Sequence, residues 1–153
     1  MDTVKVGLYF GSFNPIHIGH LMIGAYIKEH LDIDEVWFVL SPQNPLKDKE
    51  LLTDEAHRLK MLELAVENET AFKCSDIEFH LSKPSYTINT LNYLSELHKN
   101  CQFYLIIGTD NLALFHKWKN ADEIMEKYNV IVYPRSVSVE KDIMLNYHNV
   151  QLI

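Results

Sequence analysis

The chain has 153 residues, of which 47% are hydrophobic and 23% are charged, proportions typical of one globular domain. Its formal net charge of −7 disfavours non-specific binding to nucleic acid, which needs a basic face, but allows a small anionic ligand in a locally positive pocket. No apolar run approaches the ~20 residues that span a bilayer, and the N-terminus lacks the features of a secretion signal. We therefore expect a cytoplasmic protein that binds neither nucleic acid nor a membrane. Its two cysteines, Cys74 and Cys101, are expected to be reduced thiols, because no second pair completes a metal site.

The predicted elements alternate between strands and helices. In chain order, we predict a strand at Val4–Phe10, a helix at His20–Leu31, a strand at Val36–Leu40, a loop at Ser41–Lys49, a helix from Thr53, strands at Ala71–Ser75 and Ile77–Phe79, a helix at Tyr86–His98, a strand at Phe103–Ile107, a helix at Ala121–Lys127 and a strand at Val130–Tyr133. In the first helix Leu21, Ala25, Lys28 and Leu31 lie roughly a turn apart, and the apolar face of the second is Met61, Leu62, Ala65 and Val66. Because the strands are continuous apolar runs, the sequence predicts an α/β fold in which helices cover both faces of a parallel sheet.

The first strand ends in a loop that combines glycine, proline and histidine. In open α/β sheets, ligands bind beyond the carboxyl ends of the strands, and Gly11 stands at such an end. Glycine lets backbone amides approach a ligand closely, and Ser12 adds a hydroxyl donor. His17 and His20 can face the same way where Gly19 opens a helix, whose free amides attract anions. The pattern predicts a binding site for a phosphate chain.

Two common phosphate motifs do not describe this loop. Its glycine spacing differs from the dinucleotide fingerprint, and it lacks the Gly-Lys-Ser/Thr ending of the Walker P-loop. One alternative is a histidine pair that only satisfies the start of a helix. Another is a zinc site, which needs a third ligand that no histidine or cysteine nearby in the sequence supplies.

The stretch GSFNPIHIGH, residues 11–20, resembles the first motif of the nucleotidylyltransferase superfamily, a histidine, any residue, a glycine and a histidine. Later segments make the chain similar to the bacterial nicotinate-nucleotide adenylyltransferases. In the family's order they are NPLK (44–47), where the family usually has Pro-Pro-His-Lys, RLKMLELA (58–65), PSYTINTL (84–91), IIGTDNLALFHKW (106–118) and VYPR (132–135). The resemblance extends over essentially the whole chain and implies a Rossmann-like fold of the nucleotidylyltransferase type.

The reaction that the resemblance implies joins nicotinate mononucleotide to ATP and yields deamido-NAD and pyrophosphate, a step in NAD biosynthesis. The attacking phosphate is already mostly ionised at neutral pH, since its second pKa is about 6. No general base is therefore required, and the task is to align two polyanions and to stabilise developing charge. Cationic donors and a Mg²⁺ ion held mainly through the ATP phosphates suit that task, and no side-chain metal ligands are assigned.

The resemblance also implies roles for individual residues. The implied catalytic residues are His17, His20 and Lys47; those that bind ATP are Gly11, Ser12, Phe13, His17, His20, Gly108 and Asp110; those that bind nicotinate mononucleotide are Thr87 and Trp118. His20 is expected to act on the transition state, and Leu46 replaces a histidine that contacts phosphate in the family. Structural alternatives remain open: a solvated lysine, a turn cap at Asp110, and core packing or capping at Thr87 and Trp118. Arg135 is either a phosphate contact or a surface cation.

Family members carry one further segment near the C-terminus, similar to Ile-Ser-x-Thr-x-Ile-Arg, that helps to hold the ATP phosphates. The sequence reaches NVQLI, residues 149–153, about where that segment begins. The expectation is one domain over residues 1–153 that lacks this motif and the helices that follow it, with a possible homo-oligomer. Two other functions stay open: a nucleotidylyltransferase with another acceptor such as phosphopantetheine, and a non-catalytic nucleotide-binding protein.

Overall fold

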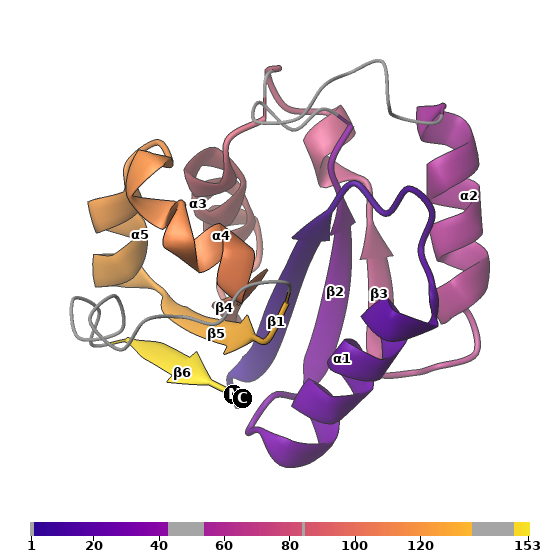
Figure 1. Cartoon of the computed structure of the whole chain (residues 1–153), viewed down its shortest axis with the longest axis horizontal. Coiled ribbons are helices and arrows are strands. Elements are labelled where there is room, and N and C mark those ends of the chain that lie inside the picture. The colour runs from indigo at the N-terminus through magenta and orange to yellow at the C-terminus, as the bar shows by residue number, and fades with distance from the viewer. Residues whose placement is uncertain (1, 43–53, 84, 136–148) are drawn as a thin grey trace.

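The structure, a computed structural model, describes residues 2–42, 54–83, 85–135 and 149–153. Its strands form one sheet in the order β3-β2-β1-β4-β5-β6, and every neighbouring pair is parallel (Figure 1). The strands are β1 (Val4–Gly11), β2 (Glu35–Leu40), β3 (Phe72–Ser75), β4 (Cys101–Gly108), β5 (Asn129–Tyr133) and β6 (Val150–Leu152). The helices are α1 (Ile18–His30), α2 (Glu55–Val66), α3 (Thr87–Leu97), α4 (Thr109–Ala113) and α5 (Ala121–Lys127), with 3₁₀ turns η2 (Ile77–Phe79) and η3 (Phe115–Lys117).

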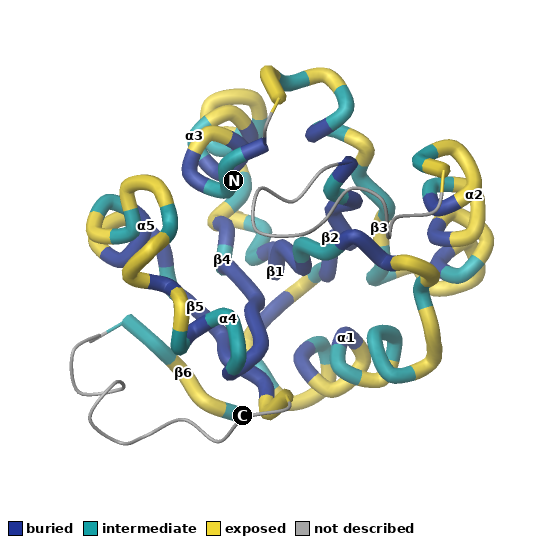
Figure 2. Tube along the Cα trace, turned by 45° about the horizontal axis from the view of Figure 1, so that its top comes forward, coloured by how far each residue is buried: buried dark blue, intermediate teal, exposed yellow. Residues whose placement is uncertain are grey.

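Successive strand residues pack into two separate cores, one on each face of the sheet. In β2, Trp37 and Val39 belong to one core, while Val36 and Phe38 belong to the other. Helices α3, α4 and α5 cover the first core, and α1 and α2 cover the second (Figure 1). Figure 2 shows buried residues along the central strands and exposed residues on the outer sides of the helices. The predicted α/β fold with helices on both faces is confirmed.

The strand order reverses between β1 and β4, which lie side by side at the centre of the sheet. Chain connections leave the neighbouring carboxyl ends of these two strands in opposite directions, so a crevice forms there, and this is where α/β sheets bind ligands. Strand β1 ends at Gly11 and strand β4 ends at Gly108. Both predicted binding loops therefore start at one place in the sheet.

The inward face of α1 differs from the predicted one. The helix begins at Ile18 rather than His20, and its buried residues are Gly24 and Ile27, whereas Ala25 is exposed. The reason is Gly24: a Cβ atom there would lie 2.9 Å from the Phe38 ring, so the helix approaches the sheet at its glycine. Apolar spacing alone does not report this approach.

Helix α2 departs from prediction at its start and on its face. Asp54 caps it, and the Asp54 carboxylate accepts a hydrogen bond from the Ala56 amide at 2.8 Å; the predicted start, Thr53, lies outside the described residues. The buried stripe is Arg58, Leu62 and Val66, while Met61 is exposed. The prediction placed Met61 inside because it did not allow a charged residue to occupy the inward position.

The segment Ile77–Phe79 was predicted to be a strand piece and is the 3₁₀ turn η2. The Phe79 amide donates to the Asp76 carbonyl at 2.9 Å, which closes the turn and places Glu78 in the interior. Two short elements after β4, α4 and η3, and the strand β6 were not predicted. Within the described ranges, no helix is long and apolar enough to cross a membrane.

Candidate functional site

The loop after β1 is built on a buried phenylalanine. Phe13 adopts a positive φ of 41°, a conformation that costs a bulky residue of order 1–3 kcal/mol. Its ring is 3% exposed and packs edge-on against Tyr9 and Phe38, and this burial offsets the cost. A Cβ atom at Gly11 would lie 3.0 Å from the Phe13 ring, so the glycine also makes room for this packing. The Phe13 side chain supports the loop and leaves only its backbone available to a ligand.

His17 and His20 cap the start of α1 reciprocally. The Gly19 amide donates to Nδ1 of His17 at 3.1 Å, and the His17 amide donates to Nδ1 of His20 at 3.1 Å. The two imidazoles stack with their centres 3.7 Å apart. Helix-start amides usually receive such bonds from serine, threonine or aspartate, so histidines in both roles are an uncommon use of these side chains.

These caps determine which face of each imidazole is presented to a ligand. Because both Nδ1 atoms accept hydrogen bonds, each neutral ring carries its proton on Nε2. The two rings therefore present two Nε2–H donors, held parallel by the stack and by the helix backbone. Gly19 is required for this geometry, since a Cβ atom there would lie 2.9 Å from Cε1 of His17.

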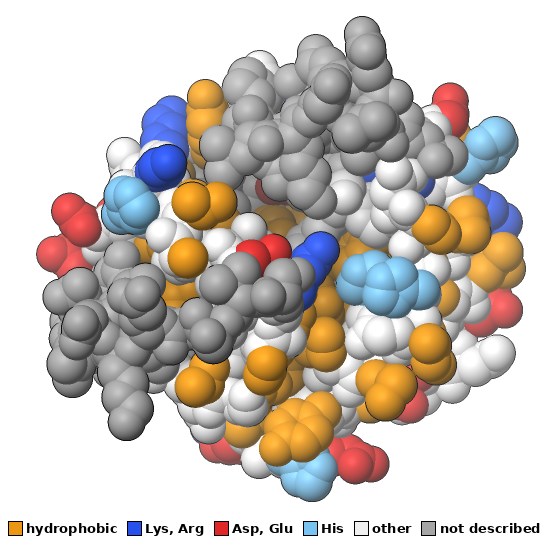
Figure 3. All heavy atoms as spheres, viewed as in Figure 1, with side chains coloured by type: hydrophobic (Ala, Val, Ile, Leu, Met, Phe, Trp, Pro, Cys, Tyr) orange, Lys and Arg blue, Asp and Glu red, His pale blue; other side chains and the backbone are white. Residues whose placement is uncertain are grey.

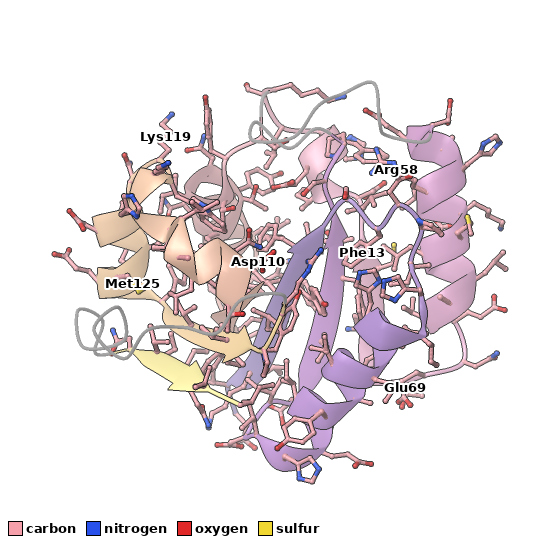
Figure 4. All side chains as sticks on the ribbon, viewed as in Figure 1. Phe13, Arg58, Glu69, Asp110, Lys119 and Met125 are labelled. Atoms are coloured by element: carbon pink, nitrogen blue, oxygen red, sulfur yellow. The ribbon has the colours of Figure 1, made fainter. Side chains whose placement is uncertain are left out.

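The ring of His20 packs against two aromatic side chains. It contacts Tyr9 and Phe13 edge-on, with ring centres 6.1 Å and 5.1 Å away. Burial raises the pKa of the Tyr9 hydroxyl far above its ordinary value, so Tyr9 stays neutral beneath the imidazole. Figure 4 labels Phe13 beside the first turn of α1. The orientation of the His20 ring is thus fixed by packing against Tyr9 and Phe13 and by the hydrogen bond that its Nδ1 atom accepts from the His17 amide.

The carboxyl end of β4 carries the second group of predicted residues. Asp110 lies in the first turn of α4, and its buried Oδ1 atom has no hydrogen-bond partner in the part of the chain that the structure describes. Its Oδ2 atom is 3.7 Å from Nε of Arg135. Thr109 fixes that arginine, because its hydroxyl donates to the Arg135 carbonyl at 2.7 Å and accepts from the Arg135 amide at 2.9 Å. A Cβ atom at Gly108 would lie 2.6 Å from Oδ1 of Asp110, so only glycine fits there.

Charged and histidine side chains lie next to one another on this side of the molecule. Figure 3 shows an acidic group, a basic group and a histidine pair in a row across this face, with apolar side chains around them. The geometry suits a ligand with anionic groups at the histidines and hydroxyl groups at the carboxylate.

The third group of predicted site residues, near the start of α3, contains Thr87 and Trp118. Thr87 is the first residue of α3, whose cap Tyr86 offers no side-chain hydrogen bond to the helix. The Trp118 ring lies against Phe115 with centres 4.9 Å apart, and its buried Nε1–H has no partner among the residues that the structure describes. The ammonium of Lys119 lies 4.7 Å from the centre of the Tyr86 ring, which joins the loop before α5 to the start of α3.

A buried arginine connects the loops that follow β1 and β2, and no role was predicted for it. Arg58 is 1% exposed, and its guanidinium donates to the carbonyl of Ser12 at 2.6 Å and to that of Ser41 at 3.0 Å. A third bond reaches the Pro42 carbonyl at 3.3 Å. Burial lowers the pKa of Arg58, but a guanidinium keeps its charge at neutral pH. The only signal in the sequence was a charge on the inward stripe of a helix.

Glu78 extends this network across the sheet to α3. Its carboxylate is 2% exposed and accepts hydrogen bonds from the Ser41 hydroxyl at 2.9 Å and the Thr90 hydroxyl at 2.6 Å. Since Ser41 also binds Arg58, a continuous chain of bonds leads from Ser12 to the helix that begins at Thr87.

Lys47 and Leu46 lie outside the described residues, so the predicted position of this lysine at the site stays a prediction. No group of three His, Cys, Asp or Glu residues within the described ranges could hold a metal ion.

Comparisons with known proteins agree with this arrangement. Residues 8–151 match the family described as cytidylyltransferase-like. A probable nicotinate-nucleotide adenylyltransferase of Flavobacterium johnsoniae is 48% identical over 95% of this chain and 75% of the relative, and one of Cytophaga hutchinsonii is 49% identical over 98% and 78%. Among solved structures, Plasmodium falciparum nicotinic acid mononucleotide adenylyltransferase complexed with NaAD has a TM-score of 0.85 at 26% identity, covering 98% of this chain and 74% of that one.

We predict that Gly19→Ala separates helix stability from ligand binding. Alanine stabilises a helix by about 0.5–1 kcal/mol relative to glycine, and this gain is opposed by the loss of the His17 cap, which costs about 0.5–2 kcal/mol, so the Tm should change little. The new methyl group displaces the His17 ring, and ATP should bind about tenfold more weakly or worse, since a lost hydrogen bond to a charged group costs ~1.5–3 kcal/mol. Calorimetric titration and side-chain ¹⁵N NMR of His17 measure these effects. In a His17→Ala background, Gly19→Ala should change ATP affinity no further; an equal loss there would contradict the explanation.

Glu78 gives a prediction for the pH dependence of stability. Burial raises the pKa of its carboxyl, an effect that the bonds from Thr90 and Ser41 only partly oppose. A carboxyl with a higher pKa in the folded state stabilises the fold below its unfolded pKa and loses that contribution as the pH rises through its folded pKa. The free energy of unfolding of the wild type minus that of Glu78→Gln should therefore fall between pH 4 and pH 7 in urea titrations. The matched exchange at exposed Glu126 should show a smaller trend; an equal one would contradict the assignment.

Proposed function

We infer that the chain, which belongs to the nicotinate-nucleotide adenylyltransferases of the cytidylyltransferase-like family, transfers the adenylyl group of ATP to nicotinate mononucleotide. The products are deamido-NAD and pyrophosphate, and the step serves NAD biosynthesis. The observation that carries the proposal is the reciprocally capped pair His17 and His20, which presents two Nε2–H donors at the carboxyl end of β1. The NaAD complex of the Plasmodium falciparum relative is consistent with a dinucleotide product in this fold.

The chemistry needs alignment rather than proton transfer. An oxygen of the mononucleotide phosphate attacks the α-phosphorus of ATP, and the bond from that phosphorus to the bridging oxygen breaks. The electron pair of that bond leaves with pyrophosphate. The attacking phosphate is mostly a dianion at neutral pH, because its second pKa is about 6. The protein therefore has to hold two mutually repelling anions in line and to neutralise charge on the departing group.

His17 and His20 meet the second requirement. Their Nε2–H groups donate to oxygens of the ATP phosphates, and because their Nδ1 atoms are bound to backbone amides, the donors need no reorganisation during the reaction. His20 is the more restrained of the two, since it also contacts Tyr9 and Phe13. We assign it to the transition state, and His17 to binding and orientation of the phosphates.

The nucleoside of ATP is assigned to the end of β4. Oδ1 of Asp110 is a buried acceptor without a partner among the described residues, and a ribose hydroxyl would supply the missing donor. Gly108 keeps that space open, and Arg135 adds positive charge beside it through its contact with Asp110. This assignment makes Arg135 part of the ligand-facing wall rather than an isolated surface cation.

The acceptor mononucleotide is assigned to the start of α3. The indole of Trp118 offers a flat face to the electron-poor pyridine ring, and Thr87 with the first amides of α3 can donate to its carboxylate. We also propose a Mg²⁺ ion held mainly through the ATP phosphates, which when bound would add countercharge for the leaving pyrophosphate. The same proposal includes Lys47 as a further cation at the phosphates. It also includes a cytoplasmic location, a possible homo-oligomer and no nucleic-acid partner.

A substrate panel tests the function directly. With ATP and the full-length native protein, nicotinate mononucleotide should release pyrophosphate faster than nicotinamide mononucleotide or phosphopantetheine. Product identity is checked by mass spectrometry. A preference for phosphopantetheine would transfer the protein to another acceptor class, and nucleotide binding without pyrophosphate release from any acceptor would make it a binding protein.

The variant His20→Ala tests whether His20 acts on the transition state rather than on ATP binding. We expect kcat to fall by about 10²–10³, the loss measured for a preorganised donor to developing charge, with a smaller change in the ATP KM. The matched control is His30→Ala, which removes an exposed imidazole at the other end of the same helix. A His20→Ala enzyme with kcat within a few-fold of the wild type would show that this histidine only caps the helix.

A further inference from the structure

Lys119 reaches from the loop before α5 to the start of α3. It directly follows Trp118 and precedes Asn120, whose positive φ of 53° turns the chain into α5. Its Nζ atom lies 4.7 Å from the centre of the Tyr86 ring, and Tyr86 is the cap of α3. Figure 4 labels Lys119 at the end of the molecule where α3 begins. A cation is thus fixed by its aromatic contact beside the residues assigned to the pyridine ring.

The electrostatic surroundings leave this cation available to a ligand. Several lysines of the described segments have carboxylate partners, as Lys127 has Glu123 at 2.7 Å and Lys83 has Glu55 at 3.6 Å, while others have none. No carboxylate within the described part of the chain forms an ion pair with Lys119. The first turn of α3 holds no acidic residue either, so the positive end of its dipole is not neutralised by the helix itself.

Two buried polar atoms independently indicate a ligand at this place. Ser85, next to the cap of α3, is 8% exposed, and its hydroxyl has no hydrogen-bond partner among the described residues. Within the same ranges, the Nε1–H of Trp118 is also buried without a partner. Buried polar groups are nearly always paired in folded proteins. Two orphan groups beside an unpaired ammonium and a free helix start therefore favour an acceptor-rich group such as a carboxylate.

We propose that Lys119 is a specificity-determining residue that favours the nicotinate carboxylate over the nicotinamide amide. The inference rests on the proposed function, because it assigns the pyridine ring to Trp118. A carboxylate gains Coulomb attraction from the ammonium and from the start of α3, whereas the neutral amide gains none. The Tyr86 ring restrains the side chain and removes part of its hydration, which strengthens its action at short range.

The competing explanation is that Lys119 only braces Tyr86. Bracing would support the pyridine site equally for the acid and the amide, because the two substrates differ only at the substituent on the ring. A charge effect would change the ratio of kcat/KM for the acid to kcat/KM for the amide. Salt would also reduce that ratio, since screening weakens attraction to a partly exposed charge. The ratio cancels contributions from the phosphates that both substrates share.

The experiment compares Lys119→Met with Lys117→Met in the full-length native protein. Both changes remove one exposed lysine charge, and among the described residues it is Lys119, not the η3 residue Lys117, whose ammonium lies over the Tyr86 ring. We expect Lys119→Met to lower the acid-to-amide ratio about fivefold, the upper end for a partly exposed ion pair, and to flatten its dependence on NaCl. Lys117→Met should leave both unchanged, and Lys119→Arg should restore most of the ratio.

The outcomes separate this inference from the proposed function. A wild-type enzyme that uses neither mononucleotide would overturn the function. A wild type that prefers the acid, with Lys119→Met keeping both the ratio and its salt dependence, would overturn only the role of Lys119. Equal losses for acid and amide, with quenching of Trp118 fluorescence weakened for both, would assign Lys119 to bracing and would also reject the proposal.

Discussion

The parallel direction of the whole sheet is the constraint on which the site depends. Because the described strands all point the same way, their carboxyl ends share one edge, and the order reversal between β1 and β4 opens a crevice at the middle of that edge. The phosphate loop leaves β1 at Gly11, and the loop with Asp110 leaves β4 at Gly108. Helices that return from this edge must begin near it, so α1 and α3 both place their positive ends at the crevice. Electrostatic preference for anions is thus a property of the topology before any side chain is added.

In the proposed function, the same two side chains both cap the helix and bind phosphate, through different ring nitrogens. A capped helix start needs acceptors, and a phosphate site needs donors. Imidazole supplies both, because Nδ1 of His17 or His20 accepts from the backbone while Nε2 is the position that carries the proton of the neutral ring. Serine or aspartate would cap the helix equally well but would leave no donor of this kind at that distance from the backbone. Gly19 is also needed for this arrangement, since a Cβ atom at that position would collide with the His17 ring.

Local patterns in the sequence were sufficient to predict the central strands and the first loop. They were insufficient where contacts with distant segments of the chain determine the structure. The strands and the glycine–histidine loop could be predicted because apolar runs and turn residues report on their own backbone. The turn at Ile77–Phe79 could not, since a short apolar run fits a strand as well as a 3₁₀ turn. Arg58 could not be given a role either, because its three carbonyl partners lie in other segments. Strand β6 escaped prediction for a similar reason: a short half-exposed strand depends on its pairing with β5.

Buried charge in this protein serves geometry rather than proton transfer. The attacking phosphate is ionised without help, so a buried acid or base would add nothing to the chemical step. Arg58 and Glu78 are nevertheless almost completely buried, and both bind Ser41. Through Ser12 on one side and Thr90 on the other, their bonds connect the loop assigned to ATP with the helix assigned to the acceptor. Two polyanions that repel each other must be held within a narrow range of distances, and misplacement by about 1 Å can cost 10²-fold in rate. A charged network that is costly to bury is retained, on this view, because it fixes the two binding sites relative to each other.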